Sequence, residues 1–353
     1  MISDWVQGKK VTLDELAIFS RQMHTLTKAG VPITSALRQL AGNARSPRMS
    51  TALYGIVENL ESGQDLASSM QDYATIFTPI MISMIRVGEN SGKLDEAFLR
   101  LNQYLEMEAT TIKRVKASLR YPVFVVISIV SAVILVNIFV IPTFANVFAQ
   151  SGMELPRMTQ ILIDISHFFA RFWFLVLILV GAIIGLVTHY LRTPDGKLAW
   201  HRYQLQIPIV GIIIKRIILL RFSQSFSLIV SSGIPVIEGL GLVAQTMDNV
   251  YARKEVLLIQ ESVQHGKSLT QSVAATGLFT PLELQMLSVS EDTGELAGML
   301  DQLGLFYRRE VDYDLKRLSD IIEPVLIIGL AIVVLMLAFS VYLPIWNMVK
   351  LAH

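Results

Sequence analysis

The amino-acid sequence predicts an all-α integral membrane protein with three transmembrane helices and two duplicated cytoplasmic helical-bundle domains. Three observations carry this prediction: long uncharged stretches, an internal repeat, and no sustained period-two alternation in the rest of the chain. Hydrophobic residues make up 52% of the 353 residues and charged residues only 17%, and the mean hydropathy is +0.51. This composition argues against a disordered chain and against an ordinary soluble enzyme.

The charge balance and the cysteine content exclude further classes of protein. Thirty Lys and Arg residues against 29 Asp and Glu residues leave a net charge of +1, so the overall charge recruits no nucleic acid. The chain has no cysteine, which excludes a disulfide scaffold, a thiol nucleophile and a thiolate metal site.

The first domain, residues 1–119, is predicted to be a cytoplasmic helical bundle. Its N-terminus lacks the apolar core of a signal peptide, so we expect no cleavage. Thr12 and Glu15 form a capping box, and apolar residues follow at helical spacing. Gly30 is then expected to supply a left-handed helix cap, and Pro32 to lie in the first turn of the next helix, where its missing N–H is not needed.

The membrane region is predicted as a transmembrane helix at 120–142, an extracytoplasmic loop at 143–171 and a second transmembrane helix at 172–191. Uncharged stretches of about 20 residues are long enough to cross a bilayer core of about 30 Å. Basic residues cluster before the first span and after the second, whereas the loop between them carries few. We therefore place the N-terminus in the cytoplasm and the C-terminus outside it.

The remainder of the chain repeats the first part at an offset of 203 residues, which becomes 202 after a one-residue difference in a loop. The segment VGENSGKL at 87–94, for example, corresponds to VSEDTGEL at 289–296. Gly233 and Pro235 repeat the pattern of Gly30 and Pro32. The repeat predicts three further parts: a second cytoplasmic helical domain at 192–322, a transmembrane helix at 323–344 and an extracytoplasmic tail at 345–353.

The repeat also pairs residues at the ends of the spans: Tyr121-Pro122 with Glu323-Pro324, and Pro142 with Pro344. We expect Glu323-Pro324 to open the third span, because proline suits a first turn and a carboxylate suits the positive end of a helix. Pro142 and Pro344 are predicted either to stop their helices near the outer surface or to act as paired hinges that shape a groove in the membrane.

No catalytic, cofactor-binding or metal site is predicted. The segment from Gly88 to Leu94 has three residues between its glycines where a phosphate loop needs four, and Leu94 stands where Ser or Thr is required. We interpret it as a link between two helices with a glycine cap. The six histidines include no His-x-x-x-His pair. The interiors of the spans carry almost no ionisable residue, which argues against an ion-coupled transporter.

These residues resemble a known family, the inner-membrane platform proteins of type II secretion and type IV pilus systems. The resemblance covers about residues 12–350. It rests on the two Gly-x-Pro turns, on the Gly-Glu-x-x-Gly-x-Leu turn (Gly88, Glu89, Gly92) and its second copy (Glu291, Gly294), on the run from Arg114 to Tyr121-Pro122 that leads to Ile141-Pro142, and on Glu323-Pro324. One position departs from the pattern: Ser290 stands where the first glycine of the second turn is expected.

The resemblance implies a non-enzymatic scaffold of the bacterial inner membrane, without a cofactor and with a periplasmic loop and tail. The partners it implies are a hexameric cytoplasmic assembly ATPase, the transmembrane helices of pilins or pseudopilins, other inner-membrane assembly proteins and a second copy of the chain in a homodimer. Its implied role is to convert ATPase motion into extraction of pilins from the bilayer and their addition to a fibre. The machine stays open: secretion, twitching pili or an adhesive pilus of the MSHA type.

Two other classes of protein are weighed against this interpretation. A permease subunit that works with a separate ATPase would carry polar residues inside its spans, and this chain has almost none. A membrane-bound signalling receptor would need the loop at 143–171 as its sensor, and that loop is short for a ligand-binding domain.

Overall fold

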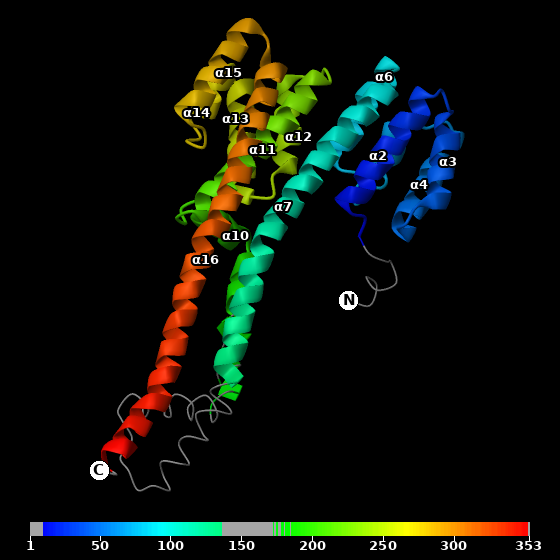
Figure 1. Ribbon diagram of the computed structural model, residues 1–353. Helices are drawn as coiled ribbons and strands as arrows, with labels where there is room; N and C mark the ends of the chain where they lie inside the picture. The colour runs from blue at the N-terminus through cyan, green and yellow to red at the C-terminus, as the bar shows by residue number, and fades with distance from the viewer. Residues whose placement is uncertain are drawn as a thin grey trace. The chain divides into compact units, whose positions relative to one another are not determined.

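The computed structural model describes residues 10–135 and 172–351, apart from 173, 176, 177, 180 and 184. Every element of secondary structure in the described residues is an α-helix (Figure 1), which confirms the all-α prediction. The chain divides into two compact units. One contains 1–114 and 198–313, and the other contains 115–197 and 314–353.

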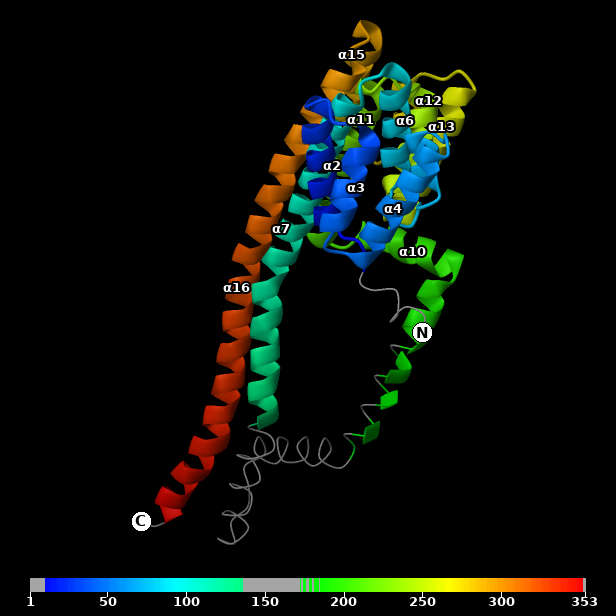
Figure 2. The same ribbon diagram turned by 90° about the vertical axis from the view of Figure 1, so that its right-hand side faces the viewer.

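The first unit contains two bundles whose helices follow the same order, apart from one additional helix at the start of the second (Figures 1 and 2). The helices of the first bundle are α2 (Leu13–Lys28), α3 (Ile33–Asn43), α4 (Pro47–Glu61), α5 (Leu66–Gln71), α6 (Pro79–Ser91) and the start of α7 (Leu94–Leu135). The helices of the second are α10 (Pro194–Gln204), α11 (Val210–Ser231), α12 (Val236–Thr246), α13 (Val250–Gln264), α14 (Leu269–Ala274), α15 (Pro281–Thr293) and the start of α16 (Leu296–Leu351). From α12 onward each helix begins at the repeat offset from its counterpart, which confirms the duplication.

The first helix pair of each bundle is built largely as predicted. Thr12 and Glu15 cap α2 reciprocally: the Thr12 N–H donates to Glu15 Oε2 at 2.8 Å, and the Glu15 N–H donates to Thr12 Oγ1 at 3.3 Å. Gly30 and Gly233 have φ of +76° and +83°, the left-handed conformation that a glycine cap needs.

The prediction that Pro32 and Pro235 lie in the first turn of their helices is wrong by one residue. Each occupies the N-cap position, with ψ of 136° and 142°, and helical geometry begins only at the residue that follows. The fixed φ of proline suits both positions, and the N–H of an N-cap residue also lies outside the hydrogen-bond ladder of the helix.

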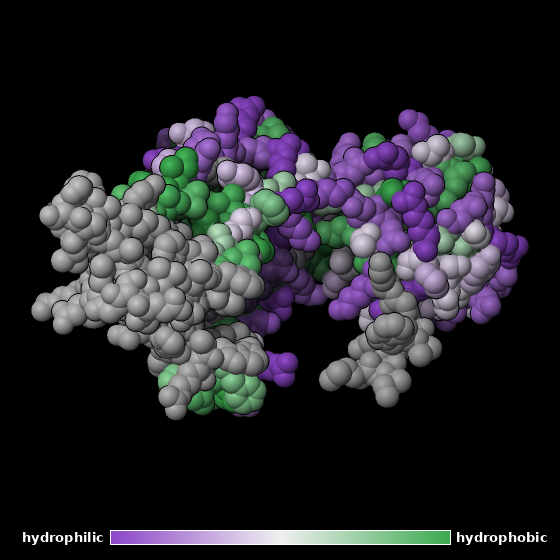
Figure 3. Space-filling model, turned by 60° about the horizontal axis from the view of Figure 1, so that its bottom comes forward, coloured by the Kyte–Doolittle hydropathy of each residue, from purple (hydrophilic) through white to green (hydrophobic). Residues whose placement is uncertain are grey.

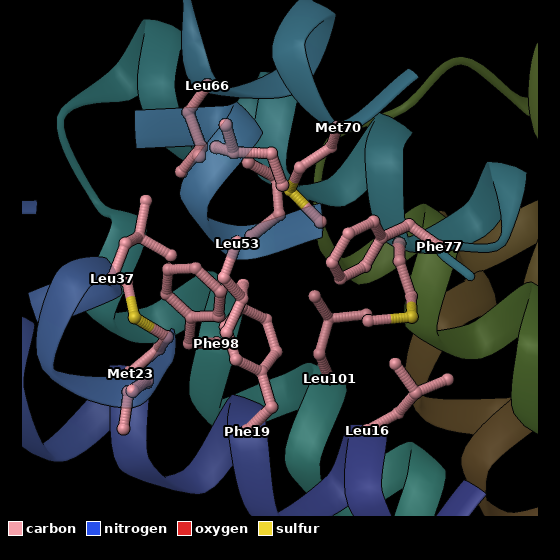
Figure 4. Packing of buried hydrophobic residues seen from close by; sticks show 14 of the residues in the cluster. Leu16, Phe19, Met23, Leu37, Leu53, Leu66, Met70, Phe77, Phe98 and Leu101 are labelled. Atoms are coloured by element: carbon pink, nitrogen blue, oxygen red, sulfur yellow. The ribbon is translucent and has the colours of Figure 1, made fainter. Parts of the chain in front are cut away.

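The core of the first bundle gathers around Phe19 of α2. Its ring lies 6.0 Å from that of Phe98 in an edge-to-face arrangement and 5.8 Å from that of Phe77. Leu16 and Met23, one turn to either side, are also buried (Figure 4). In the second bundle Phe222 stands at the position of Phe19 and packs against Phe279 at 5.2 Å. The helical stripe that the sequence predicts is therefore the core stripe of the bundle.

The two longest helices, α7 and α16, each run on through a proline. Pro122 lies inside α7, and Glu323-Pro324 lies inside α16. The prediction that Glu323-Pro324 opens a helix is therefore wrong, because α16 begins at Leu296 and no free helix end meets the Glu323 carboxylate. A proline removes one backbone hydrogen bond, and the turns on both sides hold the helix together.

Pro344 also lies inside α16, which continues to Leu351, so it does not stop the helix. Its proposed role as a hinge stays a prediction. Its partner Pro142 and the loop at 143–171 lie outside the described residues.

The second unit exposes apolar side chains along its helices. Phe124 and Ile127 of α7 and Val325 of α16 are each more than half exposed. Among the described residues, one helix, Leu94–Ala132, is long and apolar enough to cross a membrane. The described residues from 172 to 192 are helical as well. A large exposed apolar surface of this kind is typical of a segment in contact with lipid or protein.

Candidate functional site

The turn from Gly88 to Leu94 joins α6 to α7 and has no phosphate-loop geometry. Gly92 caps α6 in the left-handed conformation with φ of +69°, and the Lys93 N–H donates to the Gly88 carbonyl at 2.7 Å. The Lys93 ammonium lies 3.6 Å from the carboxylate of Glu96. The structure thus confirms the interpretation as a link between helices with a glycine cap, and Gly294 with φ of +74° does the same for α15.

Glu89, near the end of α6, joins this helix to the start of α5 through two hydrogen bonds. Its two carboxylate oxygens accept the N–H groups of Leu66 at 2.7 Å and of Ala67 at 3.1 Å, the first two residues of α5. The next free N–H, that of Ser68, donates to the N-cap residue Asp65 at 3.0 Å. This hydrogen bond lowers the pKa of Asp65 below its ordinary value of 3.8. Glu89 and Asp65 together satisfy the free amides at the start of α5.

The second repeat preserves this arrangement. Glu291 accepts the N–H groups of Leu269 and Thr270 at the start of α14, and also the hydroxyl of Thr270. The N-cap residue Ser268 accepts the Gln271 N–H at 3.1 Å. Sequence analysis singled out both glutamates but missed this role. A sequence signal for it is the spacing: each glutamate lies 22 or 23 residues after the first residue of a short helix that begins with an N-cap residue.

The surroundings of Gly88 and of its counterpart Ser290 explain the departure from the family pattern at this position. A Cβ atom on Gly88 would lie 2.7 Å from the Cβ of Ala97, because α6 and α7 approach closely here. Ser290 is fully buried, and its hydroxyl donates to the Leu287 carbonyl of its own helix at 2.7 Å. The second repeat therefore accommodates a side chain at this position and satisfies its polar atom.

The predicted motif residues do not converge on one site. Gly30 and Gly233 lie at the turns after α2 and α11, and the two glutamates lie at the ends of α6 and α15. Four further motif residues belong to the second unit: Tyr121, Pro122, Glu323 and Pro324. Among the motif residues that the structure describes, each serves its own helix end or helix, and none is grouped with its neighbours into a catalytic arrangement.

The most elaborate polar cluster lies between the two repeats, where α7 meets α11. Arg221 of α11 forms ion pairs with Glu108 of α7 and, at 2.6 Å, with Asp248. The Arg221 and Glu108 side chains are each only 14% exposed. Burial by itself would lower the pKa of the Arg221 guanidinium, but the two carboxylates outweigh it and raise that pKa. Sequence analysis missed this cluster, because nothing in either repeat alone indicates its partner.

Further contacts extend this interface along the same two helices. Arg100 donates to the Ser231 hydroxyl at 2.6 Å, and the Tyr104 hydroxyl lies 3.2 Å from that of Ser225. Ile80 of α6 is buried in the core of the second bundle, and α6 also contacts α12. The repeats therefore pack as one body with a buried, mixed apolar and polar interface.

The histidines of the two bundles serve the backbone. His201 Nδ1 accepts the Val250 N–H at 2.8 Å and so caps α13, and the His24 ring lies 2.8 Å from the Asp95 carbonyl. Within the described ranges, no group of three or more His, Asp or Glu side chains is placed to hold a metal ion. In the end-on view of Figure 3 the coloured surface is mostly hydrophilic, with hydrophobic patches between the hydrophilic residues.

Comparison with known proteins gives two matches to one family along this chain. The family described as Type II secretion system (T2SS), protein F matches residues 19–142 and again residues 222–344. The chain is 31% identical over 338 residues to Type II secretion system protein F of Vibrio cholerae, which covers 96% of this chain and 83% of the relative. It is 30% identical to Type IV pilus assembly protein PilC of Pseudomonas aeruginosa (97% and 91% covered) and 29% identical to PilC of Myxococcus xanthus (97% and 81% covered).

Proposed function

Because this chain belongs to the Type II secretion system protein F family, we propose that it couples a cytoplasmic assembly ATPase to the extraction and polymerisation of pilin-like subunits. It does so as the inner-membrane platform of a type IV pilus or type II secretion machine. The observation that carries this conclusion is the pair of family matches, each of which covers one bundle and the long helix that leaves it. The relatives named above are secretion and pilus assembly proteins, and none of them is a permease.

The proposed topology has three spans, at 120–142, 172–191 and 323–344. The exposed apolar side chains of the second unit support it, because they would be costly in water and are favourable in lipid. Basic residues beside the spans support an orientation with both bundles in the cytoplasm and with the loop at 143–171 and the C-terminus in the periplasm.

The proposed partners fit the division of labour between the two units. The bundles carry exposed charged side chains, such as Arg38 and Glu61, that an ATPase can contact, and the apolar helices offer a surface to pilin transmembrane helices. The motif residues stabilise helices: Glu89 and Glu291 hold backbone amides, and Lys93 pairs with Glu96. A scaffold without catalysis of its own is the function that suits this use of its polar groups.

A deletion strain tests the platform role directly. Loss of the chain should abolish surface fibres or secreted substrate while pilin levels persist, and the tagged wild-type chain should restore them and co-purify with the assembly ATPase. Uptake of small solutes should be unchanged in the deletion strain. Normal fibres and secretion together with lost uptake of one solute would instead favour the permease subunit.

Reporter fusions test the topology. A reporter that is active only outside the cytoplasm should be silent after residues 60 and 260 and active after residues 155 and 353. Activity after residue 260 would contradict the three-span arrangement, because it would place the second bundle in the periplasm.

A further inference from the structure

In the interface between the repeats, each bundle contributes one face. The duplication gives each bundle a second face, equivalent to the one that its neighbour contributes, and these second faces lie outside the interface. The first bundle contributes residues of α6 and α7, and the second contributes residues of α11, α12 and the loop before α13. By duplication, the second bundle carries a counterpart of the α6 and α7 surface. We call it the α15–α16 face, and its residues are Leu282, Val289, Phe306 and Glu310. The first bundle carries a counterpart of the α11 surface, which we call the α2 face, with residues Ile18, Gln22, Lys28 and Arg45.

Exposure separates the used surfaces from their counterparts. Ile80 is 2% exposed against the second bundle, whereas its counterpart Leu282 is 50% exposed. Val87 packs partly buried against the same core, whereas Val289 is 43% exposed. Phe306, the counterpart of the half-buried Tyr104, is 40% exposed. The second bundle therefore presents an apolar face of the kind that the first bundle buries.

The α2 face shows the same contrast from the other side. Ser225 is fully buried, whereas its counterpart Gln22 is exposed. Ile18, at the position of Arg221, is 44% exposed. Ile18 and Arg45 also line a surface pocket together with Lys10 and Ser46. In the second bundle the corresponding pocket holds His201, whose carbonyl accepts the side-chain amide of Asn249.

Ser46 adds an independent sign that the α2 face is incomplete. It stands at the position of Asn249, is 7% exposed, and its hydroxyl has no hydrogen-bond partner among the described residues. A buried polar atom without a partner costs free energy unless water or a group from another molecule satisfies it, and a docked surface can supply such a group.

We propose that the α15–α16 face of one copy docks on the α2 face of a second copy, and so repeats between chains the contact that joins the two bundles within a chain. The occupant of each face is thus another copy of this chain. The proposal rests on the self-association expected for the platform and names the surfaces that carry it. Because the two faces differ, the contact is head to tail.

Charge complementarity supports this pairing. Within the chain, Glu108 meets Arg221, which also pairs with Asp248. Glu310 is the counterpart of Glu108. At the α2 face the arginine lies on the loop and not on the helix: Ile18 stands at the position of Arg221, and the exposed Arg45 stands at the position of Asp248. Glu310 pairs with Arg216 of its own chain at 2.8 Å, and on docking its carboxylate would meet the Arg45 guanidinium as a second cation. Arg309 would come near Arg21, whose charge is already paired with Glu106.

The direction of the helices also suits a membrane protein. Within the first unit, α7 and α16 lie side by side and run in the same direction (Figures 1 and 2), with Arg114 of one paired to Asp312 of the other. Superposing the first bundle on the second therefore keeps the direction of the long helix. If the same contact forms between two chains, the long helices of both chains point to the same side, as a single membrane requires.

The cysteine-free chain offers a direct test by thiol cross-linking. Gln22 and Phe306 correspond to Ser225 and Tyr104, whose hydroxyls lie 3.2 Å apart within the chain. Because the tyrosine ring separates its hydroxyl from its Cβ, the two Cβ atoms of such a pair are too far apart for a direct disulfide. The full chain with Gln22→Cys and Phe306→Cys is therefore treated in native membranes with a short bifunctional maleimide. We expect cross-linked dimers from the double variant, and from two co-expressed single variants, but from neither single variant alone.

Matched controls make the test decisive. Leu257→Cys, at an equally exposed apolar residue of α13, replaces Phe306→Cys in the control pair and should give no cross-link. Adding Arg45→Glu to the double variant should lower the cross-linked fraction about five-fold, with helix content unchanged by circular dichroism. A cross-link from Phe306→Cys alone would overturn the proposal in favour of a symmetric contact. A dimeric mass without the Gln22–Phe306 cross-link would overturn it while leaving self-association intact. Fibre assembly by the wild-type chain tests the platform role separately.

Discussion

The two bundles share their interiors and differ at their surfaces. Phe19 and Phe222 occupy equivalent core positions, and Glu89 and Glu291 cap equivalent short helices. At the surface, by contrast, Ile18 stands where the second bundle has Arg221, and Arg45 where it has Asp248. The two copies therefore share the core and capping residues that one bundle needs in order to fold. They differ at surface residues, which decide what each bundle contacts.

Removal of the buried cation between the bundles should have the strongest effect on their contact. Arg221→Ala leaves the Glu108 carboxylate buried and unpaired, so we expect a loss of about 3 kcal/mol in the stability of the contact between α7 and α11. Arg21→Ala, at the exposed pair with Glu106, should cost less than about 1 kcal/mol.

Hydrogen exchange of peptides from α7 and α11 measures both effects. Adding Glu108→Gln to Arg221→Ala should recover part of the lost protection, because no buried charge then remains. Equal losses for Arg221→Ala and Arg21→Ala would contradict a special role for the contact between repeats.

Next in size is the loss of the capping glutamates. Glu89→Ala frees the amides of Leu66 and Ala67, and Glu291→Ala frees those of Leu269 and Thr270, so we expect about 2 kcal/mol of local destabilisation in each bundle. Faster exchange of these amides, with the rest of the bundle unchanged, is the readout. Glu96→Ala, at an exposed side chain of the same turn, is the matched control. An effect in one bundle only would show that the glutamate stabilises the short helix in that bundle and not in the other.

Substitution of the left-handed glycines should cost less. Gly92→Ala and Gly294→Ala each force an alanine to a φ near +70°, at a cost of about 1 kcal/mol. Gly88→Ala should cost more than either, because its Cβ would lie 2.7 Å from that of Ala97, whereas Ser290→Ala should be nearly neutral. The thermal midpoint of the purified chain orders the four variants, and a costly Ser290→Ala would show that the second turn also depends on its side chain.

The smallest expected difference is in how the stability of α5 and of α14 depends on pH. Asp65 caps α5, and its pKa is lowered below 3.8 by the Ser68 N–H, so its contribution is complete above that pH and is lost as the pH falls below 3.8. Ser268, which caps α14, does not titrate. Protection of Ser68 relative to Gln271 should therefore fall as the pH drops below 3.8, and Asp65→Ser should abolish that change. An unchanged ratio in the wild-type chain would contradict the assignment.

The sequence predicted the features that are local or periodic. The core stripe around Phe19, the Thr12 capping box and the left-handed Gly30 follow from spacing and from single-residue preferences, and the structure confirms them. The start of a helix at Glu323-Pro324 was predicted wrongly, because a proline that suits a first turn is also tolerated within a long helix. The partners of Glu89 and of Arg221 could not be predicted from the sequence, because packing between distant segments decides which groups meet.

The cap on α5 has a consequence for the order in which the chain folds during synthesis. A six-residue helix is too short to persist by itself, because nucleation is costly and few turns repay it. The carboxylate that binds its first two amides is made 23 residues later, about one to several seconds at ordinary rates of translation. We therefore expect α5 to remain unprotected on the ribosome until α6 has emerged and carried Glu89 into place. The same delay recurs at α14, so each bundle closes with a short internal helix rather than with the last segment to be synthesised.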